Sequence, residues 1–181
     1  MTQNQLTKLI KGYVAETSIG PSALRGQGAS GVIAAARQFV KDLNLSRIPT
    51  SNGRSYERWL DRQTNLMLRT FPARARNWGA ARKALNLFLR DAYYNQFLNR
   101  TYHIGRSARH FEIILDSIVV RRLRLMDVAG VLPRWAGLKH VTPAESTIFQ
   151  QFAIRIAKSQ RVHPVHLDVL LWSPRRRAAA G

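Results

Sequence analysis

The spacing of apolar residues along the chain predicts helices joined by short connections. The clearest apolar stripe lies in residues 78–98, and it recurs at the three- and four-residue intervals of one helix face. Its members are Ala81, Ala84, Leu85, Phe88, Leu89 and Ala92. Similar patterns predict helices near residues 31–43, 55–70, 117–126 and 143–159, and a short one in the first 14 residues. Signals for strands are few and short, so the expected fold is a compact, all-α, multi-helix domain.

Turn-forming and capping residues divide these patterns. Phe71-Pro72 ends the helix before it, because proline disfavours a helical conformation at the residue that precedes it. Asp116-Ser117 and the sequence VTPAES at residues 141–146 each have the composition of a helix start. Residues 18–31, rich in Gly, Ser and Pro, are interpreted as a connector, since their spacing matches no phosphate-binding motif.

Length and composition fit one globular domain. The chain has 181 residues, of which 45% are hydrophobic, enough to form a core. We expect a single domain over residues 1–173. Residues 174–181, which begin in a run of arginines and end in Ala and Gly, are expected to form a disordered basic tail.

The charge of the chain points to a polyanionic partner. The formal net charge is +19, and the 29 cations comprise 23 Arg and six Lys spread along the sequence. Arginine forms bidentate bonds with phosphate and stacks on bases, whereas lysine acts as a point charge. Nucleic acid is therefore the expected partner, with DNA and RNA not distinguished by charge. An anionic membrane surface and a merely solvated basic face are the alternatives.

Several classes of site and location are excluded or disfavoured. The chain has no cysteine, which rules out disulfides, iron–sulfur clusters and a thiol nucleophile. No apolar run approaches the length of a membrane span, and the first residues lack a signal-peptide pattern. We therefore expect a cytoplasmic, nucleoid-associated monomer that needs no metal or cofactor and does not enter membranes.

Two of the ten acidic residues, Asp116 and Asp168, lie within apolar runs. A carboxylate in such surroundings must be hydrogen-bonded, paired or functional. For Asp116 the structural explanation is an N-cap at the start of the helix predicted over 117–126, which would also fix the carboxylate in place. Asp168 follows His163 and His166 in an arrangement with the ligand types of a metal site, although the spacing matches no known motif.

Two short segments together resemble the catalytic signature of the helix-hairpin-helix DNA glycosylase superfamily. The first, residues 79–83, reads GAARK and is similar to the family's Gly-x-Gly-x-Lys, with Gly79 and Lys83 matching and Ala81 at the second glycine. The second, residues 116–121, reads DSIVVR and is similar to Asp-x-His-Val-x-Arg, with Ile118 at the histidine. The resemblance covers residues 71–125 and implies a helix-hairpin-helix fold.

The resemblance implies an enzyme that removes a damaged or modified base flipped out of duplex DNA, in repair or in phage defence. Asp116 would stabilise the oxocarbenium-like transition state or activate water. Lys83 would either contact phosphate or attack the sugar carbon and form a Schiff base that permits strand cleavage. The expected DNA contacts are Arg76, Trp78, Gly79, Arg82, Asn86, Arg121 and Arg122. Tyr93 and Tyr94 are the expected residues of the base pocket.

Two other functions fit parts of the sequence. A helical nucleic-acid-binding module without catalysis would share the arginine bias and the scattered charge, and Asp116 would then act only as a cap. A nuclease centred on His163, His166 and Asp168 would depend on metal or histidine chemistry. The placement of Lys83 and Asp116 in one cleft is the observation expected to separate the glycosylase from both.

Overall fold

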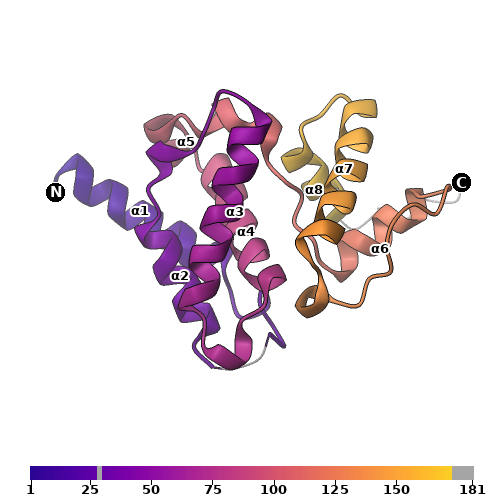
Figure 1. Cartoon of the computed structure of the whole chain (residues 1–181). Helices are drawn as coiled ribbons and strands as arrows, with labels where there is room; N and C mark the ends of the chain where they lie inside the picture. Colours follow the sequence, from indigo (N-terminus) through magenta and orange to yellow (C-terminus); the bar gives the residue numbers. More distant parts are fainter. Residues whose placement is uncertain (28–29, 173–181) are drawn as a thin grey trace, which may run out of the picture.

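The computed structural model describes residues 1–27 and 30–172, so the predicted tail at 174–181 lies outside the described residues. Within them the chain is all-α, as predicted, with no strand (Figure 1). The α-helices are α1 (Gln3–Ser18), α2 (Val32–Asp42), α3 (Gly53–Thr70), α4 (Trp78–Tyr94), α5 (Gln96–Tyr102), α6 (Ser117–Met126), α7 (Pro143–Ser159) and α8 (Pro164–Trp172). Short 3-10 segments lie at η1 (Leu45–Arg47), η2 (Ala73–Ala75), η3 (Ile104–His110) and η4 (Leu138–His140).

Local capping signals account for the helix boundaries. α6 starts after Asp116 and α7 starts after Thr142, whose side chain forms a capping box with Glu145, and both helices have the bounds that the sequence predicts. The single helix predicted over 78–98 is wrong at its C-terminal end, because α4 stops at Tyr94 and a separate helix follows. Asn95 ends α4, and its side chain accepts a bond from the Leu98 N–H, which starts α5.

Two hydrophobic clusters make up the core. The N-terminal cluster is formed mainly by α1–α5 and includes Leu60, Leu85 and Phe88. The C-terminal cluster is formed by α6–α8 with the segments around them and includes Val120 and Phe149. Figure 1 shows the two groups of helices side by side, with α4 of the first group facing the second.

The connector between the clusters is residues 111–116, which run without helical structure from η3 to α6. Gln150 holds its backbone at Ile113, since the Gln150 side chain accepts from the Ile113 N–H and donates to the Ile113 carbonyl, both at 3.0 Å. Asp168 accepts from the next N–H, that of Ile114, at 2.9 Å. The segment that leads to Asp116 is therefore fixed by two buried side chains of the C-terminal helices.

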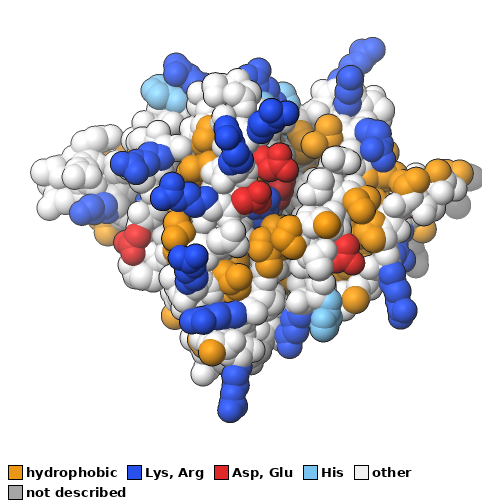
Figure 2. All heavy atoms as spheres, viewed as in Figure 1, with side chains coloured by type: hydrophobic (Ala, Val, Ile, Leu, Met, Phe, Trp, Pro, Cys, Tyr) orange, Lys and Arg blue, Asp and Glu red, His pale blue; other side chains and the backbone are white. Residues whose placement is uncertain are grey.

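The surface carries its positive charge in a dispersed form. Figure 2 shows Lys and Arg side chains spread over the viewed face, with few acidic groups between them. None of the helices in the described residues is long and apolar enough to cross a membrane.

Candidate active site

A cavity of about 650 Å³ lies where the N-terminal cluster meets the C-terminal cluster. Its walls come from the end of α1 and the loop after it, from α4, from the start of α6 and from α8. This volume lies within the usual range for sites that hold small molecules. Both Lys83 and Asp116 line the cavity, so the structure brings together the two residues on which the family resemblance depends.

Asp116 divides its two carboxylate oxygens between two tasks. Oδ1 accepts from the N–H groups of Ile118 and Val119, at 2.9 and 2.8 Å, which makes Asp116 the predicted N-cap of α6. Oδ2 takes no part in this cap and faces the Lys83 ammonium, 3.9 Å from Nζ. The cap thus orients the side chain, while one oxygen stays available on the cavity side.

Lys83 extends from the second turn of α4, and 12% of its side chain is exposed. Burial lowers the pKa of its ammonium, and the nearby positive charge of Arg90 acts in the same direction. The negative charges of Asp116 and Asp168 oppose this shift in the pKa. The net effect is a lowered pKa, so Lys83 loses its proton more easily than a lysine at the surface. A nucleophilic amine must be deprotonated.

A second ion pair, Arg90 with Asp168, lines the same cavity. Arg90 Nη1 lies 3.0 Å from Asp168 Oδ2, and Asp168 is almost completely buried. Burial raises the pKa of the Asp168 carboxyl, whereas the Ile114 N–H and Arg90 lower it. The sequence predicts that a carboxylate in this apolar run is hydrogen-bonded, paired or functional; Asp168 is both hydrogen-bonded and paired, and its ionic partner lies 78 residues away in sequence.

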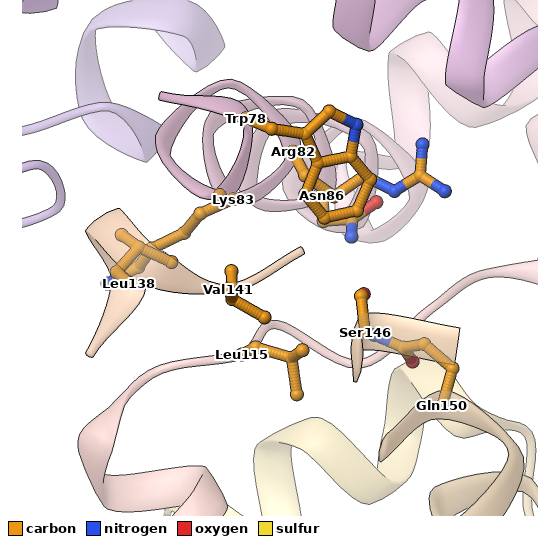
Figure 3. A pocket seen from close by; sticks show the side chains of 10 residues that line it. Trp78, Arg82, Lys83, Asn86, Leu115, Leu138, Val141, Ser146 and Gln150 are labelled. Carbon is orange, nitrogen blue, oxygen red and sulfur yellow. The ribbon is translucent and has the colours of Figure 1, made fainter. Parts of the chain in front are cut away.

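Arg82 does not line the cavity, although it adjoins Lys83 in sequence, and the two side chains project from α4 in different directions (Figure 3). It is 7% exposed, and its Nε and Nη2 each lie 2.9 Å from a separate oxygen of Glu112. Arg82 also donates a hydrogen bond to the Thr64 hydroxyl and forms an ion pair with Asp61. Asn86, one turn along α4, donates to the same Glu112. The structure therefore places these two predicted DNA contacts in a buried network that joins α3, α4 and the start of the connector.

Gly79 lies in the first turn of α4 and not in a turn before the helix. A Cβ at this position would stand 2.1 Å from the Leu138 carbonyl oxygen and 2.5 Å from Val141 Cγ1, so the glycine allows η4 to pack directly on α4. Trp78 stacks beside Arg82, with 5.0 Å from the guanidinium carbon to the ring centroid. The gap between these segments, viewed in Figure 3, holds only about 10 Å³.

The other predicted site residues do not line the cavity. Tyr93 and Tyr94 contact the ring of His166, to which the Tyr94 hydroxyl bonds at 2.9 Å. Arg76 is exposed and donates to the backbone at Phe71 and Arg69. Arg121 is exposed on α6. Arg122 donates to the Leu171 carbonyl.

His163, His166 and Asp168 do not form a common site. The two imidazole rings stack with 6.0 Å between their centroids, whereas Asp168 turns toward Arg90. Over residues 1–27 and 30–172, no three His, Asp or Glu side chains are placed to hold a metal ion.

Two residues of this region were not predicted from the sequence. Trp172, at the end of α8, is the one aromatic side chain among the described residues that line the cavity, and 58% of it is exposed. Arg90 was not predicted because its partner becomes visible only in the fold. The signal for Trp172 was its place at the end of the apolar run that contains Asp168.

Comparisons of the chain with models of protein families, with curated proteins and with solved structures find no match. The resemblance to the glycosylases accordingly rests on the residues of the two short segments and on where the fold places them.

Proposed function

We propose that this protein is a DNA glycosylase that cleaves the N-glycosidic bond of a modified base, with Asp116 as the catalytic carboxylate. One observation carries the proposal: Lys83 on α4 and Asp116, the N-cap before α6, are 33 positions apart, yet they face each other in one cavity. A surface lysine and a simple helix cap would have no reason to share a cavity of about 650 Å³.

The proposed chemistry depends on the Asp116 oxygen that takes no part in the helix cap. Loss of a base leaves positive charge on the sugar, and a fixed carboxylate beside that sugar stabilises the charge or activates the attacking water. The cap holds Oδ1, so Oδ2 is the oxygen that would act. Trp172, rather than Tyr93 or Tyr94, is the aromatic residue placed to stack on a base that enters the cavity.

Lys83 has two possible roles in this mechanism. Its amine could attack the sugar carbon as the base leaves, forming a Schiff base that leads to strand cleavage, and burial favours the deprotonated amine that this step needs. As an ammonium it would instead contact phosphate. Borohydride distinguishes the two, because it reduces a Schiff base to a stable protein–DNA adduct that Lys83→Arg would not form.

The helix-hairpin-helix fold is part of the same proposal. α3 and α4 are consecutive helices joined by residues 71–77, and Lys83 follows this connection, as in a helix-hairpin-helix. Gly79 differs from the family pattern, since it serves packing against η4. The assignment is therefore supported by the Lys83–Asp116 geometry and not by a glycine turn. A DNA substrate would place the protein at the nucleoid.

The decisive experiment measures base release from a panel of duplexes that carry oxidised, alkylated, mismatched or hypermodified bases. Asp116→Asn keeps the capping oxygen and removes the charge, so base release should fall by roughly 10²- to 10³-fold while the fold persists. Glu145→Gln is the matched control, because Glu145 accepts the Thr142 N–H and hydroxyl through one oxygen alone, at the start of α7 and outside the cavity.

Base release that survives Asp116→Asn would refute the assignment. Binding to DNA without base release from any duplex would favour a non-catalytic nucleic-acid-binding module. In that case Asp116→Asn should leave the affinity for DNA unchanged or raise it.

A further inference from the structure

A second groove, of about 600 Å³, lies on the side of the C-terminal helices that faces η3. Three long cations line it: Arg109 from η3, Lys158 from α7 and Arg161 from the turn after α7. His163 and His166, at the start of α8, complete the polar wall, and no carboxylate lines the groove. We call this surface the basic groove.

The cations of the basic groove remain available to an external anion. All three are exposed, and none of them takes part in an ion pair within the described residues. Arg109 donates only to the neighbouring His110 ring, at 3.1 Å. By contrast, Arg82 and Arg90 have their charges taken up by carboxylates. An anion that enters the groove would therefore displace no internal partner.

The backbone at Arg161 gives an independent reason to assign a role to this surface. Arg161 has φ of +55°, in the left-handed region where glycine is favoured and a side chain costs about 1 kcal/mol. Its N–H bonds to the Lys158 carbonyl, and the next N–H, of Val162, bonds to Ala157. The turn that ends α7 thus carries an arginine where glycine would relieve the strain, and the arginine projects its charge into the groove.

α8 connects the basic groove to the candidate active site. His166 lines the groove, whereas Asp168 and Trp172, farther along the helix, line the Asp116 cavity. At 1.5 Å per residue, His166 and Trp172 are about 9 Å apart along the helix axis. His166 and Asp168 are two residues apart, about 200° around the helix, so the groove and the cavity open on opposite faces of α8.

We propose that the basic groove binds the phosphodiester backbone of duplex DNA, at a fixed spacing from the base held in the Asp116 cavity. The spacing rests on the proposed glycosylase function, whereas the binding of DNA backbone by the groove does not. The groove would hold the strand in register, so that base removal occurs at one defined distance from the anchored phosphates.

The test compares two triple variants that lower the formal charge by the same amount. Arg109→Gln/Lys158→Gln/Arg161→Gln removes the cations of the groove. Lys8→Gln/Arg47→Gln/Arg74→Gln removes three exposed cations that line neither the groove nor the Asp116 cavity. Affinity for a labelled duplex is measured by fluorescence anisotropy across a range of salt concentrations. Log affinity falls as log salt rises, and each phosphate contact contributes about 0.9 to the steepness of this fall. Loss of three contacts in the groove variant should therefore make the slope shallower by about 2.7.

A single variant protects the test against misfolding. Arg161→Gly relieves the strained backbone, so it should raise the melting temperature and still lower the salt slope by about 0.9. An unchanged slope in the groove variants, or equal losses in the two triple variants, would overturn the proposal. So would loss of binding to phosphatidylserine vesicles with the DNA slope intact, because the groove would then bind membranes.

The two proposals fail in different ways. If Asp116→Asn leaves base release intact while the groove variants lose slope, the groove still binds DNA and the spacing from the cavity is wrong. If Asp116→Asn abolishes base release while the groove variants keep their slope, the glycosylase assignment remains and the groove proposal is refuted.

Discussion

Replacement of Arg82 by alanine tests whether this residue serves the fold or the DNA. In the structure Arg82 makes a bidentate pair with Glu112, with both nitrogen–oxygen distances at 2.9 Å, and the two side chains are 8% and 15% exposed. Removal of one partner from a buried pair leaves the other charge uncompensated and costs about 3–5 kcal/mol. The contact to Asp61 adds little, because that carboxylate is half exposed.

The assay is thermal and urea unfolding of Arg82→Ala beside Arg74→Ala, which removes an exposed arginine from η2. For a chain of this size each kcal/mol corresponds to about 2–4 °C, so Arg82→Ala should lower the melting temperature by roughly 6–20 °C. Arg74→Ala should change the unfolding free energy by at most about 0.5 kcal/mol. Arg82→Met combined with Glu112→Met should restore much of the loss, because no lone charge stays buried.

A loss below about 1 kcal/mol for Arg82→Ala would refute the reasoning, since it would give the pair only the strength of an exposed salt bridge. The affinity for DNA provides the second criterion, measured at a temperature at which both variants are folded. A tenfold weaker binding by Arg82→Ala alone would show that Arg82 contacts DNA, as the sequence predicts.

Two further predictions concern α4. Gly79→Ala should lower the unfolding free energy by about 1–3 kcal/mol, because its Cβ would overlap the Leu138 carbonyl and Val141. Gly12→Ala in α1, with open space around it, should instead raise the unfolding free energy by about 0.5–1 kcal/mol. Urea unfolding measures both, and equal effects would contradict the packing argument. Burial lowers the pKa of Lys83, so the folded chain releases this proton before the unfolded chain does, and stability should rise with pH from the lowered pKa up to the unfolded value near 10.4. Lys83→Met should remove that increase in unfolding free energy, as measured by urea titrations at successive pH values. Parallel curves of unfolding free energy against pH for the variant and the wild type would refute the prediction.

The elements that sequence predicted best are those whose signals are local. The bounds of α6 and α7 follow from Asp116 and Thr142, which bond to N–H groups two or three residues ahead. The split between α4 and α5 was missed because an apolar pattern continues past Asn95, whose cap interrupts the backbone without changing the stripe. Periodicity describes which face is buried, and it carries little information about a break on that face.

The candidate site divides in the same way. Asp116 could be recognised as a cap from its neighbours, and the family resemblance predicted that Lys83 would lie near it. The pairing of Arg82 with Glu112 could not be predicted, because the chain has 29 cations and ten acids and only the fold selects partners 30 positions apart. In a chain with 29 cations, charge alone does not distinguish a buried arginine from one that meets DNA.

The hydrogen bonds that fix the connector, residues 111–116, have a consequence for which ligands the Asp116 cavity could hold. Ile113 is held at both its N–H and its carbonyl, and Ile114 at its N–H, so the wall that carries Asp116 cannot retreat without breaking three hydrogen bonds. Under the proposed function, a cavity with such a wall would accommodate a base by shape and would not enlarge around it. Discrimination should therefore be steric, with an abrupt size limit beyond which a substituent on the base excludes it, and affinity should not decline gradually as substituents grow.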